Sequence, residues 1–445
     1  MKILFISLGC DKNLVDSEKM IGMLVEKGYS ITDDEEEADA VVVNTCCFIN
    51  DAKEESINTL LEMAELRKNG SIKALVAAGC LAQRYKDEIQ KEIPEVDAVI
   101  GTTAADAVIE ALERALSGEG GRYLYDINRT PDFGGRRIVT TGGHYAYLKI
   151  AEGCDKRCTY CIIPKVRGSY RSIPMEELIK EAETLAEQGV RELILVAQET
   201  TVYGVDIYGR KALSELLHKL CEIEGLHWIR LLYCYPEEIT DELINTIKNE
   251  KKICSYLDIP IQHASDRILK LMGRRTDKKE LTEIVAKLRR EIPDICLRTT
   301  LITGFPSETD EEHEELMAFV DEMEFDRLGV FTYSPEEDTP AALFDGQIDE
   351  QVKQKRQSEL MELQQEIAFD NAEKMTGRTL EVMIEGSIPE DNVYVARCYK
   401  DAPNVDGLVF VKSDRELMTG DFASVRITGS YEYDLMGDIT DEFTE

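Results

Sequence analysis

The sequence predicts a multidomain α/β protein in three parts: an N-terminal parallel α/β domain, a six-unit partial (β/α) barrel and a small C-terminal β-barrel. Its 445 residues are about three times the length of an average domain, which is roughly 150 residues. Apolar strand-like runs alternate with helical patterns over most of the chain, which is typical of parallel sheets covered by helices. Near residue 376 this alternation gives way to short strands separated by turn residues, which is typical of a small β-barrel.

The first predicted domain, residues 1–117, consists of three strand–helix units and the start of a fourth. Strands that alternate with helices form a parallel sheet with both faces covered. A stretch with seven glycines follows, between residues 117 and 143, and we interpret residues 118–139 as a linker. The predicted strands are Lys2–Leu8, Ala40–Thr45, Ala74–Gly79 and Ala98–Gly101, with helices near Asp16–Gly28, Lys53–Lys68 and Gln83–Ile93.

The second predicted domain, residues 140–375, repeats the strand–helix unit six times. A closed barrel of this kind has eight units, so we predict a partial barrel that is open along one side, where a large substrate could enter. A long charged helical pattern over Gln347–Met375 ends the domain. The predicted strands are Tyr147–Glu152, Glu192–Gln198, Trp228–Tyr233, Tyr256–Gln262, Leu297–Thr303 and Leu328–Ser334, with helices such as Met175–Gln188, Thr240–Asn249 and Glu308–Glu324 between them.

The third predicted domain, residues 376–445, contains short strands and no long helical pattern. Strands of this length with turn residues between them predict a small β-barrel. The predicted strands are Leu380–Glu385, Val393–Cys398, Gly407–Val411 and Phe422–Thr428.

The composition is that of a folded and strongly acidic protein. Hydrophobic residues make up 43% of the chain, which excludes extended disorder as the main state, and the formal net charge is −35. Such a surface repels nucleic acids and anionic membranes and attracts basic partners. No run of about eighteen apolar residues is present, so we expect no membrane span. The start, MKILFISLGCDKN, resembles a core strand more than a signal peptide, and we expect a cytoplasmic protein.

Three cysteines in the sequence Cys154-Asp-Lys-Arg-Cys158-Thr-Tyr-Cys161 are spaced as ligands of one cluster. They follow the first predicted barrel strand at its carboxyl end, where the active sites of barrels assemble. Three thiolates leave one iron of a 4Fe–4S cluster free to bind another molecule. A zinc site would need a fourth ligand, and the nearest candidate, His144, precedes the strand; three structural cysteines are the other alternative. We call Cys154, Cys158 and Cys161 the barrel cysteine set and predict that it holds a 4Fe–4S cluster.

The spacing of the barrel cysteine set, CX3CXΦC with Tyr160 at the aromatic position, resembles that of the radical S-adenosylmethionine enzymes. The resemblance implies a partial barrel in which S-adenosylmethionine chelates the open iron. It also implies that one electron from the cluster cleaves this cofactor to a radical that abstracts an unreactive hydrogen, while the protein supplies orientation and excludes water. On this basis Tyr160 is a candidate cofactor-binding residue.

Three further cysteines, Cys10, Cys46 and Cys80, each follow a predicted strand of the N-terminal domain. Because the carboxyl ends of parallel strands share one edge of the sheet, their thiols can converge without a local motif. The alternative is that they are small buried residues. We call these three the N-terminal cysteine set. The cysteines without such spacing are interpreted as packing residues: Cys221, Cys234, Cys254, Cys296 and Cys398.

Segments along the whole chain are similar to those of the methylthiotransferases. This resemblance implies a second 4Fe–4S cluster on the N-terminal cysteine set, and a C-terminal TRAM domain. Where the family has glycine after the cysteine of NTC, this chain has Cys47, which makes Cys47 an alternative ligand to Cys46. KNLVDSE and YLKIAEGCD are most similar to the members that add a methylthio group to the β-carbon of an aspartate in small-subunit ribosomal protein twelve. The similar segments are LGCDKNLVDSE, VVNTC, AAGCLAQRY, YLKIAEGCDKRCTYCIIPKVRG, PIQHASDRILKLMGRR, TLITGFPSETDEE and FTYSPEEDTPA.

Polar residues at the ends of two predicted barrel strands are candidates for further contacts with S-adenosylmethionine. Gln198 and Glu199 end the second strand, and Gln262 and His263 end the fourth. The carboxyl ends of barrel strands are where such contacts gather. The alternative is that they are ordinary strand-end residues, or, for His263, a hydrogen-bonded core histidine.

Two other functions compete with the modification of a ribosomal protein. One is methylthiolation of isopentenyladenosine in transfer RNA, and the other is a non-enzymatic iron–sulfur electron carrier, which would need no substrate-sized opening. Residues 376–445 contain six basic and fifteen acidic side chains, whereas a module that grips RNA neutralises phosphates with Lys and Arg. We therefore expect a basic protein partner, unless Lys165, Arg167 and Arg171 form a local basic patch. No motif identifies the electron donor or the source of the inserted sulfur.

Overall fold

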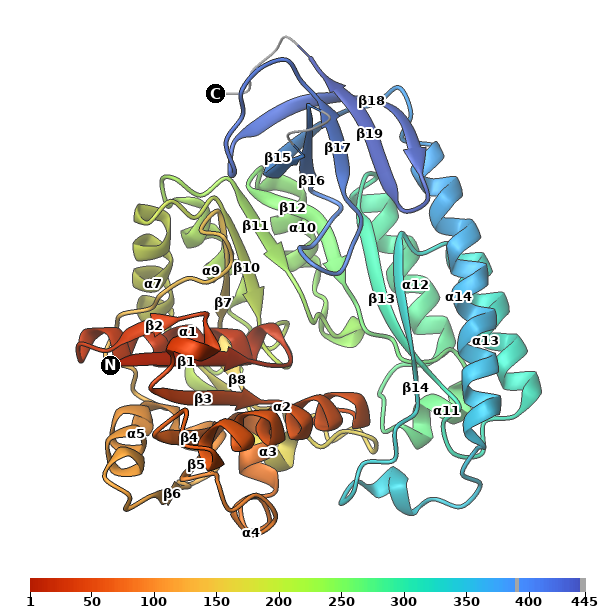
Figure 1. Cartoon of the computed structure of the whole chain (residues 1–445). Helices are drawn as coiled ribbons and strands as arrows, with labels where there is room; N and C mark the ends of the chain where they lie inside the picture. Colours follow the sequence, from red (N-terminus) through yellow and green to blue (C-terminus); the bar gives the residue numbers. More distant parts are fainter. Residues whose placement is uncertain (389–391, 441–445) are drawn as a thin grey trace.

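The computed structural model describes residues 1–388 and 392–440 (Figure 1). Its N-terminal unit is a six-stranded parallel sheet in the order β2-β1-β3-β4-β5-β6. The strands are β1 Lys2–Ser7, β2 Ser30–Thr32, β3 Ala40–Thr45, β4 Ala74–Ala78, β5 Ala98–Ile100 and β6 Gly121–Tyr123; the helices are α1 Asp11–Glu26, α2 Asn50–Lys68, α3 Gly79–Arg84, α4 Ile89–Glu92 and α5 Val108–Leu116, with 3-10 turns η1 Glu35–Glu37 and η2 Thr102–Ala107.

Helices cover both faces of this sheet. Every residue of β3 and β4 is buried, as expected for central parallel strands. Leu60 and Met63 of α2 pack on one face, and Leu24 of α1 and Leu112 of α5 pack on the other. Within the stretch predicted as a linker, β6 pairs with β5. The helix predicted near Gln83–Ile93 is instead two short helices, and the first of them begins at Gly79.

The central unit is a six-stranded parallel sheet in the order β14-β13-β12-β11-β10-β7, with free edges at β7 and β14. This confirms the predicted partial barrel. The first predicted strand is divided, because its last residues form β8, which pairs with β9 away from the main sheet. The strands are β7 Tyr145–Lys149, β8 Ala151–Glu152, β9 Arg171–Ser172, β10 Glu192–Val196, β11 Trp228–Leu231, β12 Ile253–Asp258, β13 Cys296–Thr303 and β14 Arg327–Thr332.

The helices of the barrel unit cover the outer face of its sheet, where they form the largest apolar core of the molecule. The inner face has aromatic side chains such as Tyr147 and Trp228, and it packs against Val15 of α1 at one end and Met383 and Phe422 of the C-terminal unit at the other. The helices are α6 Ile163–Arg167, α7 Met175–Glu187, α8 Val205–Tyr208, α9 Leu213–Cys221, α10 Asp241–Asn249, α11 Asp266–Leu271, α12 Lys278–Glu291, α13 Asp310–Met323 and α14 Glu350–Glu373, with 3-10 turns η3 Pro236–Glu238 and η4 Pro340–Leu343.

The C-terminal unit is a closed five-stranded barrel in the order β15-β16-β17-β19-β18. Four of its strands were predicted. The fifth, β19, has the sequence DLMGDI, whose acidic and glycine residues hide its strand character. In the part of the chain that is described, no helix is both long and apolar enough to cross a membrane. The strands are β15 Thr379–Ile388, β16 Val393–Cys398, β17 Val409–Lys412, β18 Phe422–Tyr431 and β19 Asp434–Ile439.

The N-terminal unit spans the open side of the partial barrel. Figure 1 shows it at the end of the barrel opposite the C-terminal unit. On the β7 side, Lys19 of α1 donates to Glu181 of α7 at 2.9 Å. On the β14 side, Arg84 Nη1 donates to Glu336 Oε2 at 2.7 Å, and Lys53 Nζ lies 3.0 Å from the same oxygen. The N-terminal unit is therefore held at both free edges of the barrel sheet.

Candidate active site

The barrel cysteine set lies in the loop between β8 and α6, at the carboxyl end of the first barrel strand. Cys154 and Cys158 are buried and Cys161 is half-buried. Gly153 has φ +77, and a Cβ there would lie 2.1 Å from the carbonyl oxygen of Ser169, so only glycine lets the chain turn into the loop. The Cys154 amide then donates to the carbonyl of Gly168 at 3.1 Å, which anchors the start of the loop.

The thiols of the barrel cysteine set affect one another electrostatically. Burial raises the pKa of Cys154 to about 12, and the charges of Glu199 and Cys158 add to this shift. Burial also raises the pKa of Cys161, and Cys158 and Cys154 raise it further. Such thiols stay protonated until a metal displaces the proton, because a coordinated thiol is deprotonated outright. A buried, mutually interacting set of three soft ligands fits an iron–sulfur cluster.

The N-terminal cysteine set also converges. Cys10 precedes the first turn of α1, Cys46 follows β3, and Cys80 lies in the first turn of α3. A Cβ placed on Gly9 would lie 2.6 Å from the Cβ of Cys46, so the chain leading to Cys10 passes directly over Cys46. Burial raises the pKa of Cys46 to about 12, and the nearby Cys80 and Cys10 raise it as well. The structure thus brings these three thiols together from three strand ends.

Cys46 and Cys47 have different surroundings. Cys46 lies against Gly9, next to Cys10. Cys47 is completely buried in the apolar core between the sheet and the helices α2 and α3. Adjacent side chains on an extended chain point in opposite directions, which accounts for the difference. Cys46 is therefore the better-placed ligand, although Cys47 also lies close enough to Cys80 for an electrostatic interaction.

Within the described residues, no three His, Cys, Asp or Glu side chains are close enough together to hold a single metal ion. A single zinc ion needs its ligands about 2 Å away. A cuboidal cluster instead binds each thiolate to a different iron, so its ligands stand farther apart. His144, the candidate fourth zinc ligand, pairs with Glu385 of the C-terminal unit at 2.8 Å. His144 is therefore engaged with the C-terminal unit rather than with the barrel cysteine set.

The predicted polar residues at the end of β10 lie beside the barrel cysteine set. Glu199 is 1% exposed, its Oε1 accepts a hydrogen bond from Thr201, and its Oε2 lies 3.5 Å from the Nζ of Lys156, within the cysteine loop. Burial raises the pKa of Glu199 to about 7. Gln198 donates to Glu152 Oε1 at 2.9 Å, and its own Oε1 is buried without a hydrogen-bond partner. Both side chains keep an acceptor available for a cationic or hydrogen-bonding ligand.

Tyr160 lies within the cysteine loop itself, and Gln262 follows β12. The Tyr160 ring packs against the small apolar cluster around Phe305. Gln262 has φ +75, and its backbone exchanges hydrogen bonds with Thr300 and Ile302 of β13. A non-glycine residue with positive φ is a strained conformation that often marks a functional site. The neighbouring His263 is fully buried, and its Nδ1 accepts from the Ser265 amide.

Sequence reasoning missed two groups of residues around the cysteines. Tyr235 and Arg274 lie 3.8 Å and 4.0 Å from the Cys158 sulfur, and the guanidinium stacks over the tyrosine ring. Lys149 and Glu152 form an ion pair in the first barrel strand. The sequence does hint at this ion pair, because two charged residues interrupt the otherwise apolar strand segment YLKIAE. Charges buried in a strand need partners.

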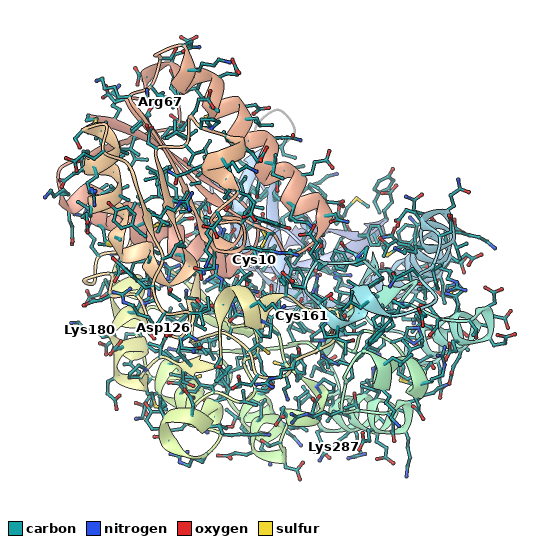
Figure 2. All side chains as sticks on the ribbon, turned by 90° about the horizontal axis from the view of Figure 1, so that it is seen from below. Cys10, Arg67, Asp126, Cys161, Lys180 and Lys287 are labelled. Atoms are coloured by element: carbon teal, nitrogen blue, oxygen red, sulfur yellow. The ribbon has the colours of Figure 1, made fainter. Side chains whose placement is uncertain are left out.

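The cysteines predicted to be packing residues agree with that interpretation. Four of the five are buried and Cys221 is half-buried. The alternative of a local basic patch at Lys165, Arg167 and Arg171 loses one member, because Arg167 is almost completely buried among polar side chains. Figure 2 labels Cys10 and Cys161, one from each cysteine set, where the N-terminal unit meets the barrel. Arg167, six residues after Cys161, donates to the Cys80 sulfur at 3.3 Å, so both sets lie at this junction.

Comparison with protein families matches three parts of the chain. Residues 2–101 match the uncharacterized protein family UPF0004, residues 148–320 match the radical SAM superfamily, and residues 376–440 match the TRAM domain. Among solved structures, the chain is similar to the radical S-adenosylmethionine methyltransferase TsrM from Kitasatospora setae, with TM-score 0.54, 14% identity and coverage of 88% of this chain and 80% of that one. The cobalamin-dependent S-adenosylmethionine radical enzyme OxsB has TM-score 0.52, 12% identity and coverage of 80% and 56%. These likenesses support the fold.

Closer relatives match the chain from end to end. A protein of Lachnoclostridium phytofermentans named ribosomal protein uS12 methylthiotransferase RimO is 63% identical over 98% of this chain and 99% of its own length. Proteins with the same name from Thermoanaerobacter and Clostridioides difficile are each 51% identical, over 97% and 99% of this chain and 98% and 99% of their own. The radical SAM match implies S-adenosylmethionine and a 4Fe–4S cluster as cofactors. The chain belongs to the RimO family of radical S-adenosylmethionine methylthiotransferases.

Proposed function

We propose that this protein transfers a methylthio group to the β-carbon of an aspartate in small-subunit ribosomal protein uS12, the substrate in the names of its relatives. The observation that carries the proposal is that two sets of three cysteines meet at one junction, one on a partial barrel and one on the sheet that spans its open side. Methylthiolation needs a hydrogen removed from an unreactive carbon and a sulfur delivered to the same carbon. The site on the barrel would serve the removal of the hydrogen, and the site on the N-terminal sheet would serve the delivery of the sulfur.

The barrel cysteine set and the N-terminal cysteine set would each hold one 4Fe–4S cluster. When bound, the first cluster with S-adenosylmethionine supplies the radical chemistry, and the second holds the sulfur to be transferred. The chain orients these groups: Glu199 and Gln198 offer acceptors to the methionyl end of the cofactor, while Tyr160 lies within the cysteine loop and Gln262 follows β12.

Charge favours a basic protein over transfer RNA as substrate. In the C-terminal unit, several basic side chains already face the barrel: Arg397 pairs with Glu192, Arg378 with Asp294, and Lys400 with Asp326. Among the residues beside the cysteine loop, Arg167 is buried, and Lys165 lies 4.0 Å from Asp338. A surface that binds RNA must leave its cations free for phosphates. A ribosomal protein, basic because it binds RNA, fits this acidic surface, and we place the reaction in the cytosol.

The test is a direct comparison of substrates. The reconstituted protein is incubated with S-adenosylmethionine, a reductant and a sulfide source, together with purified uS12 or with isopentenylated transfer RNA. We expect mass spectrometry to show a methylthio group on one aspartate of uS12 and none on the RNA. A variant with Cys154, Cys158 and Cys161 replaced by alanine is the control and should modify neither. Modification of the RNA alone would overturn the proposal.

A further inference from the structure

Arg167, the last residue of α6, connects the two cysteine sets. Its side chain is 2% exposed. Its Nε donates to the Cys80 sulfur at 3.3 Å, its Nη1 donates to Asp16 at 2.8 Å and to Glu152 at 2.9 Å, and its Nη2 donates to Asn13 at 2.9 Å. The barrel domain thereby contributes a cation that directly contacts a cysteine of the N-terminal set.

The contacts of Arg167 continue within the barrel as far as Gln198. Glu152 accepts from Arg167 through Oε2 and from Gln198 through Oε1. Gln198 lies two residues beyond the end of β10. The next residue, Glu199, lies 3.5 Å from Lys156 of the cysteine loop. An unbroken series of hydrogen bonds therefore runs from the Cys80 sulfur through Arg167 and Glu152 to Gln198.

The charged side chains around Arg167 sum to zero when the Cys80 thiolate is left out. Lys149 and Arg167 are the cations, and Asp16 and Glu152 are the anions. All four side chains are nearly excluded from solvent. Buried ion pairs stabilise a fold less than well-packed apolar residues of the same volume would, so stability alone does not explain four buried charges at this place. An arginine fork that is fixed by two carboxylates is instead a rigid donor to whatever its remaining nitrogen contacts.

We propose that Arg167 is a positioning residue for the cluster on the N-terminal cysteine set, which it orients and electronically tunes through its hydrogen bond to Cys80. This inference rests on the proposed function, because it presupposes that cluster. Hydrogen bonds to ligand sulfurs are one of the means by which a protein sets the reduction potential of an iron–sulfur cluster. A donor with a full positive charge favours the more negative, reduced cluster and so raises its potential.

The experiment isolates the cluster on the N-terminal set. In the full chain, the barrel cysteine set is replaced by alanine, so that only the other cluster contributes to iron content and to the spectrum. Arg167→Lys and Arg167→Gln are then compared with the parent by redox titration followed by electron paramagnetic resonance. Arg137→Lys is the matched control, because Arg137 is also a buried arginine that pairs with a glutamate of α1, Glu18, at 2.8 Å. Its side-chain partners among the described residues are the carboxylates Glu18 and Glu181, not a cysteine.

We expect about four iron atoms per chain in the parent and in Arg137→Lys, with the same potential. In Arg167→Gln the ratio of reduced to oxidised cluster at a fixed potential should fall at least tenfold, which is about 59 mV for a one-electron couple. Arg167→Lys keeps the positive charge but lacks the forked guanidinium, so the reduction potential of the cluster should shift less in this variant. A parent without iron would refute the second cluster and thus the proposed function. A parent with iron whose potential Arg167→Gln leaves unchanged would refute only the role of Arg167.

Discussion

Arg397 of the C-terminal barrel donates through Nη2 to Glu192 at the start of β10, at 2.7 Å, and both side chains are almost completely buried. Glu192 also accepts from Arg230 of β11 at 2.7 Å. Arg397 in turn pairs with Glu385 of its own unit. The C-terminal barrel is therefore fastened to the base of the partial barrel by buried charge pairs, at the end away from the cysteines.

Removing Arg397 should destabilise the protein strongly. Arg397→Ala leaves Glu192 with one partner instead of two in a buried setting, and breaking a buried pair costs about 3–5 kcal/mol. The free energy of unfolding from urea denaturation should fall by that amount. Arg378→Ala is the control in the same unit, because its pair with Asp294 is exposed and such pairs contribute about 0–1 kcal/mol. Equal losses in both variants would contradict the buried pairing.

Iron content should divide evenly between the cysteine sets. After anaerobic reconstitution we expect about eight iron atoms per chain. Alanine replacement of the barrel cysteine set should remove about half of them and all cleavage of S-adenosylmethionine. Replacement of the N-terminal set should also remove half, but cleavage should remain, because the cofactor binds at the other cluster. Full iron in this second variant would show that the three converging thiols hold no cluster.

Cys46 and Cys47 should differ in function although they are neighbours. Cys46→Ala should lose the iron of the N-terminal cluster, because this side chain lies against Gly9 beside Cys10. Cys47→Ala should keep the iron and lose only some stability, since Cys47 packs in the apolar core. Iron analysis and thermal unfolding of the two variants measure these effects. The opposite pattern of iron loss would assign Cys47 as the ligand.

Glu199 should make the stability of the cofactor-free protein depend on pH. Burial raises its pKa from 4.5 to about 7, so the folded protein binds this proton more tightly than the unfolded chain does. The resulting stabilisation is complete below about pH 4.5 and is lost as the pH rises through 7. Glu199→Gln should abolish this loss, which amounts to about 3 kcal/mol. Urea denaturation of both proteins at pH 5.5 and pH 8, between which about 2 kcal/mol of this loss falls, tests the prediction, and parallel changes in the two proteins would contradict it.

The sequence predicted the elements whose residues are apolar and β-branched, and missed those that depend on pairing. AVVVNT forms β3 and ALVAA forms β4, and their apolar composition was visible in the sequence. By contrast, β2, β6 and β19 are short or polar, and only the pairing with a neighbouring strand defines them. The two cysteine sets could be predicted from the sequence for the same reason, because their cysteines follow recognisable strands. The contacts of Arg167 could not be predicted from the sequence, because its partners come from α1, β8 and α3 and have no fixed spacing along the chain.

The contact of Arg84 with Glu336 joins residues 252 positions apart, and this separation bears on how the enzyme is made. The N-terminal sheet leaves the ribosome first and folds first. Arg167 and the loop that carries Glu336 are synthesised later, so the contacts that they make with Cys80 and Arg84 form only after the N-terminal sheet. We expect iron to be loaded after the last barrel strand is in place, which makes cluster assembly a checkpoint for the completed chain.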